Sequence, residues 1–559
     1  MKKPILIDNV EKGTSESEHY GFQSMVGVDV YSRKGIVRMG HTTLAQSTPY
    51  DNGAITSLPV CFEKTPSGRV YAQLADGSVI VSVNGGLSWS SVFEITGGTT
   101  PGTASGLIHY NGNASVDGYL FVFRQTAIGC YNIAANTYKA DWQTGILASD
   151  ISLSNITAGT FHFPFLFPNQ SRVYFANRNK LGYIGMGTSA TFNPAGTIAT
   201  DYAYTNAILT LPGNYIINTL AFYPPSKLAM GCCDYGNNSN ADLITWDTIT
   251  TNQFDAPIRL QSNSQPGQGG IIQMVNRNNM LYCVTGGGHK IFVTNGSTYS
   301  ELIDISLYTN LRLQGAMQTN SLSMPGSDST IQSVLCGYPF ALDIVNGRLI
   351  TGISAPYSTS QYPNSYGIYP AGVWGITLEG DPMIYQTQNK NAVCEYVPYY
   401  ENLSTASYFT PGIIFAIGAL KTMGFNSYLV GWKKSTTYGI SLVDPYLYLS
   451  DRDSGAFYRA GAILETPLIQ IGTNLRPETI SNFEIQFANK LTGQSFSIFY
   501  RNQSTDAYTL LQTISSVNES SYSITASSIG AQQFIQFAIV FYKPSNIKDS
   551  IEFKSILLT

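Results

Sequence analysis

Two tyrosine-rich segments carry the side chains with the clearest potential for binding chemistry. They span residues 356–370 and 395–400, and both are too aromatic for ordinary solvated loops. Tyrosine joins a flat apolar ring to a hydroxyl group, so it can stack on a sugar or anchor a neighbouring protein. The alternative, that these segments pack back on their own domain, stays open. The candidate contact residues are Tyr357, Tyr362, Tyr366, Tyr369, Tyr399 and Tyr400.

Other segments match a chemical motif only in part. Residues 451–455 (DRDSG) place oxygen ligands at alternate positions, but the closing glutamate of a calcium-binding EF-hand is missing. Residues 285–290 (TGGGHK) are rich in glycine, yet they lack the spacing of a phosphate loop and lead into a strand-like run. The histidines and cysteines show no metal-ligand spacing. We therefore predict turns at both segments, and no metal ion or cofactor.

The composition indicates a polar surface with few charges. Only 12% of the 559 residues are charged, against roughly 25% in ordinary proteins, and the net charge is −4. Such a surface suits a protein that packs beside copies of itself, because self-repulsion is small. It gives no basis for gripping nucleic acid, which requires clustered cations.

The seven cysteines and the first residues of the chain indicate the cellular compartment in which the protein folds. The cysteines are odd in number and lie mostly in apolar runs, which favours buried free thiols formed in a reducing cytoplasm. The first eight residues lose their apolar character at Asp8, unlike a signal peptide. The longest apolar run, near residues 413–420, is too short to span a membrane.

The pattern along the chain is typical of an all-β protein. Short apolar or alternating runs are separated by Gly, Asn, Asp and Pro, and helical periodicity is almost absent. The runs form groups of three or four, which cover residues 58–95, 106–142, 161–186, 216–260, 271–303, 340–387 and 413–449. Repeats of this size, each holding up to four strands, predict a β-propeller of about seven blades. A stack of β-sandwiches is the alternative.

The groups divide the chain into three parts. We predict an N-terminal extended arm at 1–50, the propeller at 51–461 and a C-terminal β-sandwich at 462–559, where strand-like runs recur at sandwich-like intervals. Within the arm, residues 27–31 (GVDVY) could add a strand to the last blade and close the ring. Residues 446–449 (YLYL) are expected to supply the fourth strand of the seventh group.

Residues 82–89 (SVNGGLSW) fit the Asp-box pattern S-x-[DN]-x-G-x-[ST]-W, which occurs in outer hairpins of propeller blades. Its residues here are Ser82, Asn84, Gly86, Ser88 and Trp89. Asn84 can bond to the backbone two residues on, Gly86 can take a positive φ, and Trp89 can fill the space under the turn. In the families that share it the Asp-box is scaffold, so it implies no chemistry.

The Asp-box invites comparison with sialidases, which need an arginine cluster and a Tyr–Glu pair. The chain offers only residues 257–260 (PIRL), which reverse the Arg-Ile-Pro order of that family. Few glutamates fall in aromatic loops that would raise a carboxyl pKa for acid catalysis. We therefore expect that the protein is not an enzyme.

Several segments resemble those of tail nozzle proteins of short-tailed bacteriophages. They are residues 11–15 (EKGTS), 26–30 (VGVDV), 35–38 (GIVR), 243–247 (LITWD) and 291–296 (IFVTNG). The resemblance implies a structural virion protein, made in the bacterial host cytoplasm. It would form a homo-oligomer, such as a hexamer, at the distal tail and contact an adaptor and fibres. Genomic DNA would pass through without specific binding.

Two alternatives belong to other functional classes. A receptor-binding fibre or adhesin would hold a host surface glycan, which the tyrosine-rich segments favour. A glycan-processing enzyme is the third alternative. A homotrimer that binds glycan would favour the fibre, a six-fold ring would favour the nozzle, and turnover of a glycoside would favour the enzyme.

Overall fold

The structure of the protein is a computed structural model. The described residues are 5–7, 24–26, 28–29, 37–39, 43–47, 55–93, 104–111, 118–124, 127–144, 162–168, 172–186, 202–234, 240–250, 253–261, 270–285, 290–296, 298–304, 340–353, 372–378, 392–396, 415–424, 427–434, 437–443, 461–473, 475–488, 495–503, 508–515, 519–542 and 552–559.

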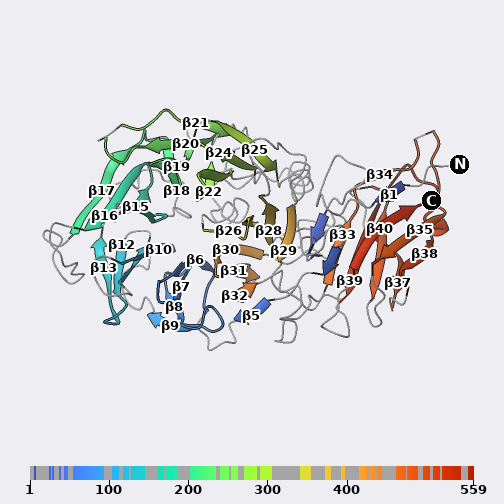
Figure 1. Cartoon of the computed structure of the whole chain (residues 1–559), viewed down its shortest axis with the longest axis horizontal. Helices are drawn as coiled ribbons and strands as arrows, with labels where there is room; N and C mark the ends of the chain where they lie inside the picture. Colours follow the sequence, from blue (N-terminus) through green and yellow to red (C-terminus); the bar gives the residue numbers. More distant parts are fainter. Residues whose placement is uncertain are drawn as a thin grey trace.

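Seven antiparallel four-stranded units form the larger domain, as the sequence predicts (Figure 1). Each is a meander of short apolar strands joined by tight turns, such as Asn346–Gly347, where both residues have a positive φ. Blade 1 consists of β6 (Pro59–Lys64), β7 (Val70–Leu74), β8 (Val79–Ser82) and β9 (Ser90–Phe93). The strands of each blade are ordered from the inside of the ring outwards.

Blades 2 to 6 repeat this order. Blade 2 has β10 (Ala104–Tyr110), β11 (Tyr119–Arg124), β12 (Ala127–Asn132) and β13 (Thr137–Thr144); blade 3 has β14 (Phe165–Phe167), β15 (Arg172–Asn177), β16 (Lys180–Met186) and β17 (Tyr202–Thr210). Blade 4 has β18 (Tyr215–Tyr223), β19 (Lys227–Asp234), β20 (Asn240–Trp246) and β21 (Ile258–Gln261); blade 5 has β22 (Ile271–Arg277), β23 (Met280–Thr285), β24 (Lys290–Thr294) and β25 (Tyr299–Asp304). Blade 6 has β26 (Leu342–Val345), β27 (Arg348–Ile353), β28 (Gly372–Thr377) and β29 (Ala392–Tyr396).

Blade 7 joins the two ends of the ring. It contains β30 (Phe415–Thr422), β31 (Tyr428–Lys434) and β32 (Thr437–Val443), and its fourth strand is β5 (Thr43–Ser47) from the N-terminal segment. The prediction that residues 27–31 close the ring is therefore wrong in its choice of strand. The place expected for residues 446–449 is taken by β5, and residues 446–449 lie outside the described part.

The ring closes because each innermost strand contacts the next one. The sequence of neighbours is β6, β10, β14, β18, β22, β26, β30 and β6 again. Buried apolar side chains fill the space between the blade faces; the rings of Phe123 in blade 2 and Phe175 in blade 3, for example, lie 5.4 Å apart. Face-to-face burial of this kind is the main stabilising contribution to the ring.

The C-terminal strands form a sandwich beside the ring (Figure 1). One layer contains β3 (Val28–Asp29), β4 (Val37–Met39), β40 (Glu552–Leu558), β35 (Asn482–Phe487) and β38 (Ser521–Thr525), with β1 (Ile5–Ile7) also paired to β40. The other contains β33 (Gly461–Glu465), β39 (Phe534–Tyr542), β36 (Phe496–Arg501) and β37 (Thr509–Ile514), with β34 (Ile469–Gln470) paired to β39. Phe483 and Phe537 meet across the layers, with ring centroids 4.5 Å apart.

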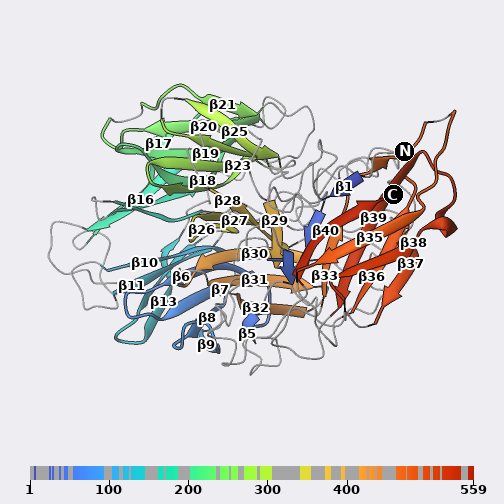
Figure 2. The ribbon, with the colours of Figure 1, turned by 45° about the vertical axis from the view of Figure 1, so that its right-hand side comes forward.

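A three-residue strand connects the propeller to the sandwich (Figure 2). This bridging strand, β2 (Ser24–Val26), pairs in parallel with β29 of blade 6 and antiparallel with β33 of the sandwich. The result is one ten-stranded sheet that runs through both domains. Met25 at its centre is fully buried in the sandwich core, together with Val393 of blade 6. The N-terminal segment thus contributes strands to both domains.

Candidate functional site

The Asp-box residues form the turn between β8 and β9, the two outer strands of blade 1. The amide of Gly86 donates to the Ser82 hydroxyl at 2.8 Å, and the amide of Ser88 donates to the Asn84 side-chain oxygen at 3.0 Å. Asn84 therefore bonds four residues on, rather than the predicted two. Gly86 has a φ of +98°, and Trp89 is 2% exposed, with its ring 6.0 Å from that of Phe62. All these contacts position the hairpin.

The six candidate contact tyrosines lie outside the described residues. Tyr357, Tyr362, Tyr366, Tyr369, Tyr399 and Tyr400 therefore stay a prediction. Residues 451–455 and 286–289 also lie outside, so the turns expected there are untested. The neighbouring Tyr396 is described, and it is buried with its hydroxyl 2.8 Å from that of Ser441.

Arg259, which lies in the PIRL segment at residues 257–260, pairs with two aspartates of blade 4. Its guanidinium lies 3.0 Å from Asp242 and 3.5 Å from Asp234, and both carboxylates are buried. The Tyr215 hydroxyl donates to Asp242 at 3.1 Å. Burial, followed by the nearby Asp242 charge, raises the pKa of Tyr215 to about 12. A tyrosine so hard to ionise, held by a carboxylate that an arginine already pairs, indicates a structural cluster.

A second buried pair lies between blades 6 and 7. Arg348 donates to Glu395 at 2.8 Å, and Tyr428 of blade 7 donates to the same carboxylate at 3.1 Å. Gly375 on the intervening strand makes this reach possible, because a Cβ atom there would lie 1.8 Å from the Glu395 oxygen. The glycine, the two charges and the tyrosine therefore act together to fix these two blades.

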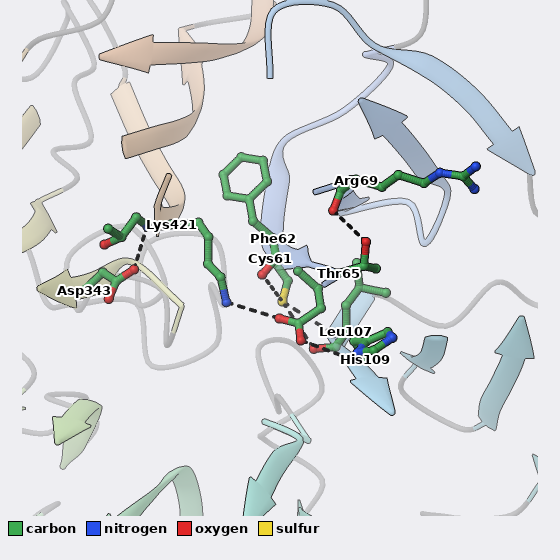
Figure 3. A network of polar contacts seen from close by, with 10 residues as sticks. Cys61, Phe62, Thr65, Arg69, Leu107, His109, Asp343 and Lys421 are labelled. Carbon is green, nitrogen blue, oxygen red and sulfur yellow. Dashed lines mark hydrogen bonds and ion pairs between the residues drawn. The ribbon is translucent and has the colours of Figure 1, made fainter. Parts of the chain in front are cut away.

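The inner strands carry a further polar network, which we call the axial cluster: Glu63, His109, Asp343 and Lys421. Figure 3 labels the last three of these residues. Lys421 Nζ of blade 7 lies 3.2 Å from Glu63 of blade 1, whose other oxygen accepts the amide of His109 in blade 2 at 3.1 Å. Asp343 of blade 6 accepts the amide of Thr422 at 2.7 Å. The axial cluster thereby connects four blades through charged hydrogen bonds.

The axial cluster places two carboxylates, those of Glu63 and Asp343, near one ammonium group, that of Lys421. Glu63 makes the largest contribution to raising the pKa of Lys421, and Asp343 adds to it, so the ammonium group stays protonated at any physiological pH. The Cys61 thiol beside it accepts the amide of Leu107 at 3.4 Å, and burial raises its pKa to about 12. A permanently charged lysine and an un-ionised thiol do not supply a nucleophile or a general base.

A cavity of about 400 Å³ opens next to the axial cluster, where blades 5, 6 and 7 meet. Its lining consists of Val275, Asn276, Arg277, Asp343, Ile344, Asn346 and Gly424. Sequence analysis did not single out any of these residues or the axial cluster. The one available signal was weak: in a chain with few charges, Glu63 and Lys421 each stand directly after an apolar run.

The described part of the chain contains no grouping of three or more His, Cys, Asp or Glu side chains arranged to hold a metal ion. Six cysteines are described, and all six are buried free thiols. No helix in the described ranges has the length and apolar character that a membrane crossing requires.

No model of a known protein family matches the sequence, and no characterised protein matches it in sequence. Among solved structures, the chain is similar to the extracellular domain of the putative hybrid two-component system BT4673 from B. thetaiotaomicron. The identity is 12%, the match covers 72% of this chain and 39% of that one, and the TM-score is 0.39. YCF48 bound to D1 peptide matches at 8% identity over 75% of this chain and 100% of that chain, with a TM-score of 0.38.

The GH74 enzyme of Niastella koreensis matches at 15% identity, over 86% of this chain and 61% of that chain, with a TM-score of 0.39. Some of these similar structures are therefore enzymes and others are not. At such identities and TM-scores the likeness does not carry a function over. What stands on the sheet topology itself is the fold: an all-β propeller of seven blades with a β-sandwich.

Proposed function

We propose that the protein is a non-enzymatic structural component of a bacteriophage tail, in a nozzle-like position that forms part of the conduit for DNA exit. The observation that supports this most is the ten-stranded sheet that continues from blade 6 through β2 into the sandwich. Turning the sandwich against the propeller would break the backbone hydrogen bonds of β2. A tail component that transmits load during ejection needs this kind of rigid joint.

The composition also supports the proposal. With 12% charged residues and a net charge of −4, copies of the chain can pack side by side with little repulsion. The same scarcity of cations would let DNA slide past without being held. We expect a homo-oligomer, such as a hexamer, that contacts an adaptor above it and fibres around it.

Purified virions provide the test of this proposal. Tailed virions purified from a culture that carries the gene are analysed by mass spectrometry, and an antibody against the sandwich is located by electron microscopy. We expect peptides of this chain in intact virions and label at the distal end of the tail. Absence of the chain from tailed particles would overturn the proposal.

The same samples distinguish the alternatives. Label at the tips of fibres, together with a trimer in native mass spectrometry, would favour a receptor-binding fibre over a nozzle. Turnover of a glycoside substrate by the purified chain would favour an enzyme. A closed ring of several copies with no turnover would agree with the nozzle-like position.

A further inference from the structure

The cavity between blades 5, 6 and 7 has opposite walls of different character. Blade 5 supplies Asn276 and Arg277, which are hydrogen-bond donors, and blade 6 supplies Asp343, which is an acceptor. Arg277 and Asp343 both line the cavity, yet they form no ion pair with each other. A ligand with its own donors and acceptors can therefore bind between them. We propose that this cavity binds an acidic saccharide, with the sugar carboxylate at Arg277 and the hydroxyls at Asn276 and Asp343.

The blade 5 side of the cavity, which we call the donor wall, has hydrogen-bond donors without acceptors among the described residues. Within the described residues, no side-chain partner is found for Arg277, which is half-buried at the end of β22. The Asn276 amide nitrogen is shielded from water and likewise has no acceptor in the described part of the chain. Leaving a shielded donor unpaired is costly, so a ligand that accepts from it gains affinity. The planar guanidinium fork is suited to a carboxylate, which it can bind through two parallel hydrogen bonds.

The acceptor wall is fixed in place. One Asp343 oxygen accepts the amide of Ile344 at 2.8 Å, and the other accepts the amide of Thr422 in blade 7 at 2.7 Å. These bonds hold the orientation of the carboxylate, and each of its oxygens keeps a second lone pair for a hydroxyl donor. A pre-positioned acceptor costs little ordering entropy when a ligand binds.

The rest of the lining sets the class of ligand. Val275 and Ile344 provide the apolar contact, Gly424 comes from blade 7, and none of the described lining residues is aromatic. About 400 Å³ lies at the lower end of the range for small-molecule pockets, which suits one or two sugar units. Since the described lining offers polar groups and no ring to stack on, we expect a sugar to be recognised by its polar edges, with the carboxylate and hydroxyls contributing most of the affinity.

The test is calorimetric titration of the full chain with three probes: methyl β-glucuronide, methyl β-glucoside and propionate. We expect the glucuronide to bind at least tenfold more tightly than either other probe, because only it offers both hydroxyls and a carboxylate. R277Q should reduce glucuronide affinity about tenfold or more and leave the glucoside affinity unchanged. N276A should weaken both sugars, and R476Q, at an exposed arginine of the sandwich, is the matched control that should change nothing.

Three results would overturn the inference. Equal affinity for glucuronide and glucoside would show that no carboxylate is recognised, and equal affinity for propionate would show a plain anion site. Absence of binding by all three probes would remove the site. The thermal midpoint of R277Q is measured alongside, so that lost binding is not confused with lost folding. Because this inference concerns small-molecule binding alone, its failure leaves the tail position untouched, and the reverse also holds.

Discussion

The molecule joins its parts in two different ways. Neighbouring blades meet face to face, through broad sets of buried side chains such as the cluster around Trp432 and Tyr428 between blades 6 and 7. The propeller and the sandwich meet edge to edge, through backbone hydrogen bonds to the three residues of β2. A face joint spreads its stabilisation over many contacts, whereas an edge joint concentrates it in a short strand. The two kinds of joint should therefore respond differently to damage.

Removing the N-terminal strands should have the largest effect. Deletion of residues 1–47 removes the bridging strand β2, the closing strand β5 and the sandwich strands β1, β3 and β4. The edge joint is then lost, and blade 7 keeps three strands. We expect loss of the single cooperative unfolding transition and rapid proteolysis of the chain, measured by calorimetry and by limited digestion. Deletion of residues 1–23 is the matched control, because β1 is the one described strand that it removes.

If the 1–23 deletion lost cooperativity as fully as the 1–47 deletion, the comparison between face and edge joints would fail. The loss would then trace to β1 or to the length of the segment. If the 1–47 deletion kept one sharp transition, the ring would be held by its faces alone and β5 would be dispensable.

The buried pair in the face joint of blades 6 and 7 should come next. Glu395→Ala leaves Arg348 buried without its carboxylate, and Tyr428 loses its acceptor. We expect a loss of about 3–5 kcal/mol in the free energy of unfolding, measured by denaturant titration. Glu301→Ala breaks the partly exposed pair with Lys290 and serves as the control, with an expected loss of about 0–1 kcal/mol. Equal losses in the two variants would contradict a specific role for the buried pair.

The face joints were largely predictable from sequence, and the edge joint was not. The apolar runs of β11 and β19 are buried, except for the first residue of β19, so their composition alone indicated strands inside a blade. The strand β2 has three residues, too few to show a period. Its neighbours, Cys394 and Ile463, lie hundreds of residues away, and no local pattern encodes such pairing. The pairing of β5 with β32 also joins residues far apart in the chain, so the sequence favoured residues 446–449, which directly follow blade 7, as its fourth strand.

In the candidate site, too, local features could be predicted from sequence and long-range contacts could not. The Asp-box was visible because its residues are adjacent in the chain, and they do form one local turn. Glu63 and Lys421 meet only because the ring closes, since they lie 358 positions apart. Two charged residues so far apart in the chain form no motif with a recognisable spacing. The cavity beside them depends on three blades at once and was invisible for the same reason.

High pH should weaken the face joints. Burial raises the pKa of Tyr110 and of Tyr204 to about 12, and burial together with Asp242 does the same for Tyr215. In the unfolded chain a tyrosine ionises near pH 10. Folded-state pKa values above the unfolded value mean that this stability is complete below about pH 10 and is lost as the pH rises towards about 12.

The measurement is the denaturant midpoint across that window, with phenolate absorbance recorded in parallel. Tyr204→Phe should reduce the alkaline loss of stability, because phenylalanine has no proton to release. A midpoint that stayed constant up to pH 12 would contradict the burial of these hydroxyls.

The smallest effect should come from the Asp-box turn. Asn84→Ala removes the acceptor of the Ser88 amide and the donor to the Ser88 hydroxyl, both in an exposed turn where water can replace them. We expect a loss of about 1 kcal/mol. Hydrogen exchange should show the change only in β8 and β9, because the face joint to blade 7 stays packed.

Gly86→Ala at the same turn provides the contrast. Gly86 has a φ of +98°, and a Cβ atom there would lie 2.6 Å from the Leu429 side chain of blade 7, so the substitution strains the backbone and disturbs the face joint. We expect a larger loss of stability than for Asn84→Ala, with faster exchange extending into β31. If the two variants behaved alike, the turn would act only locally, and the joint between blades 7 and 1 would not depend on the shape of the Asp-box.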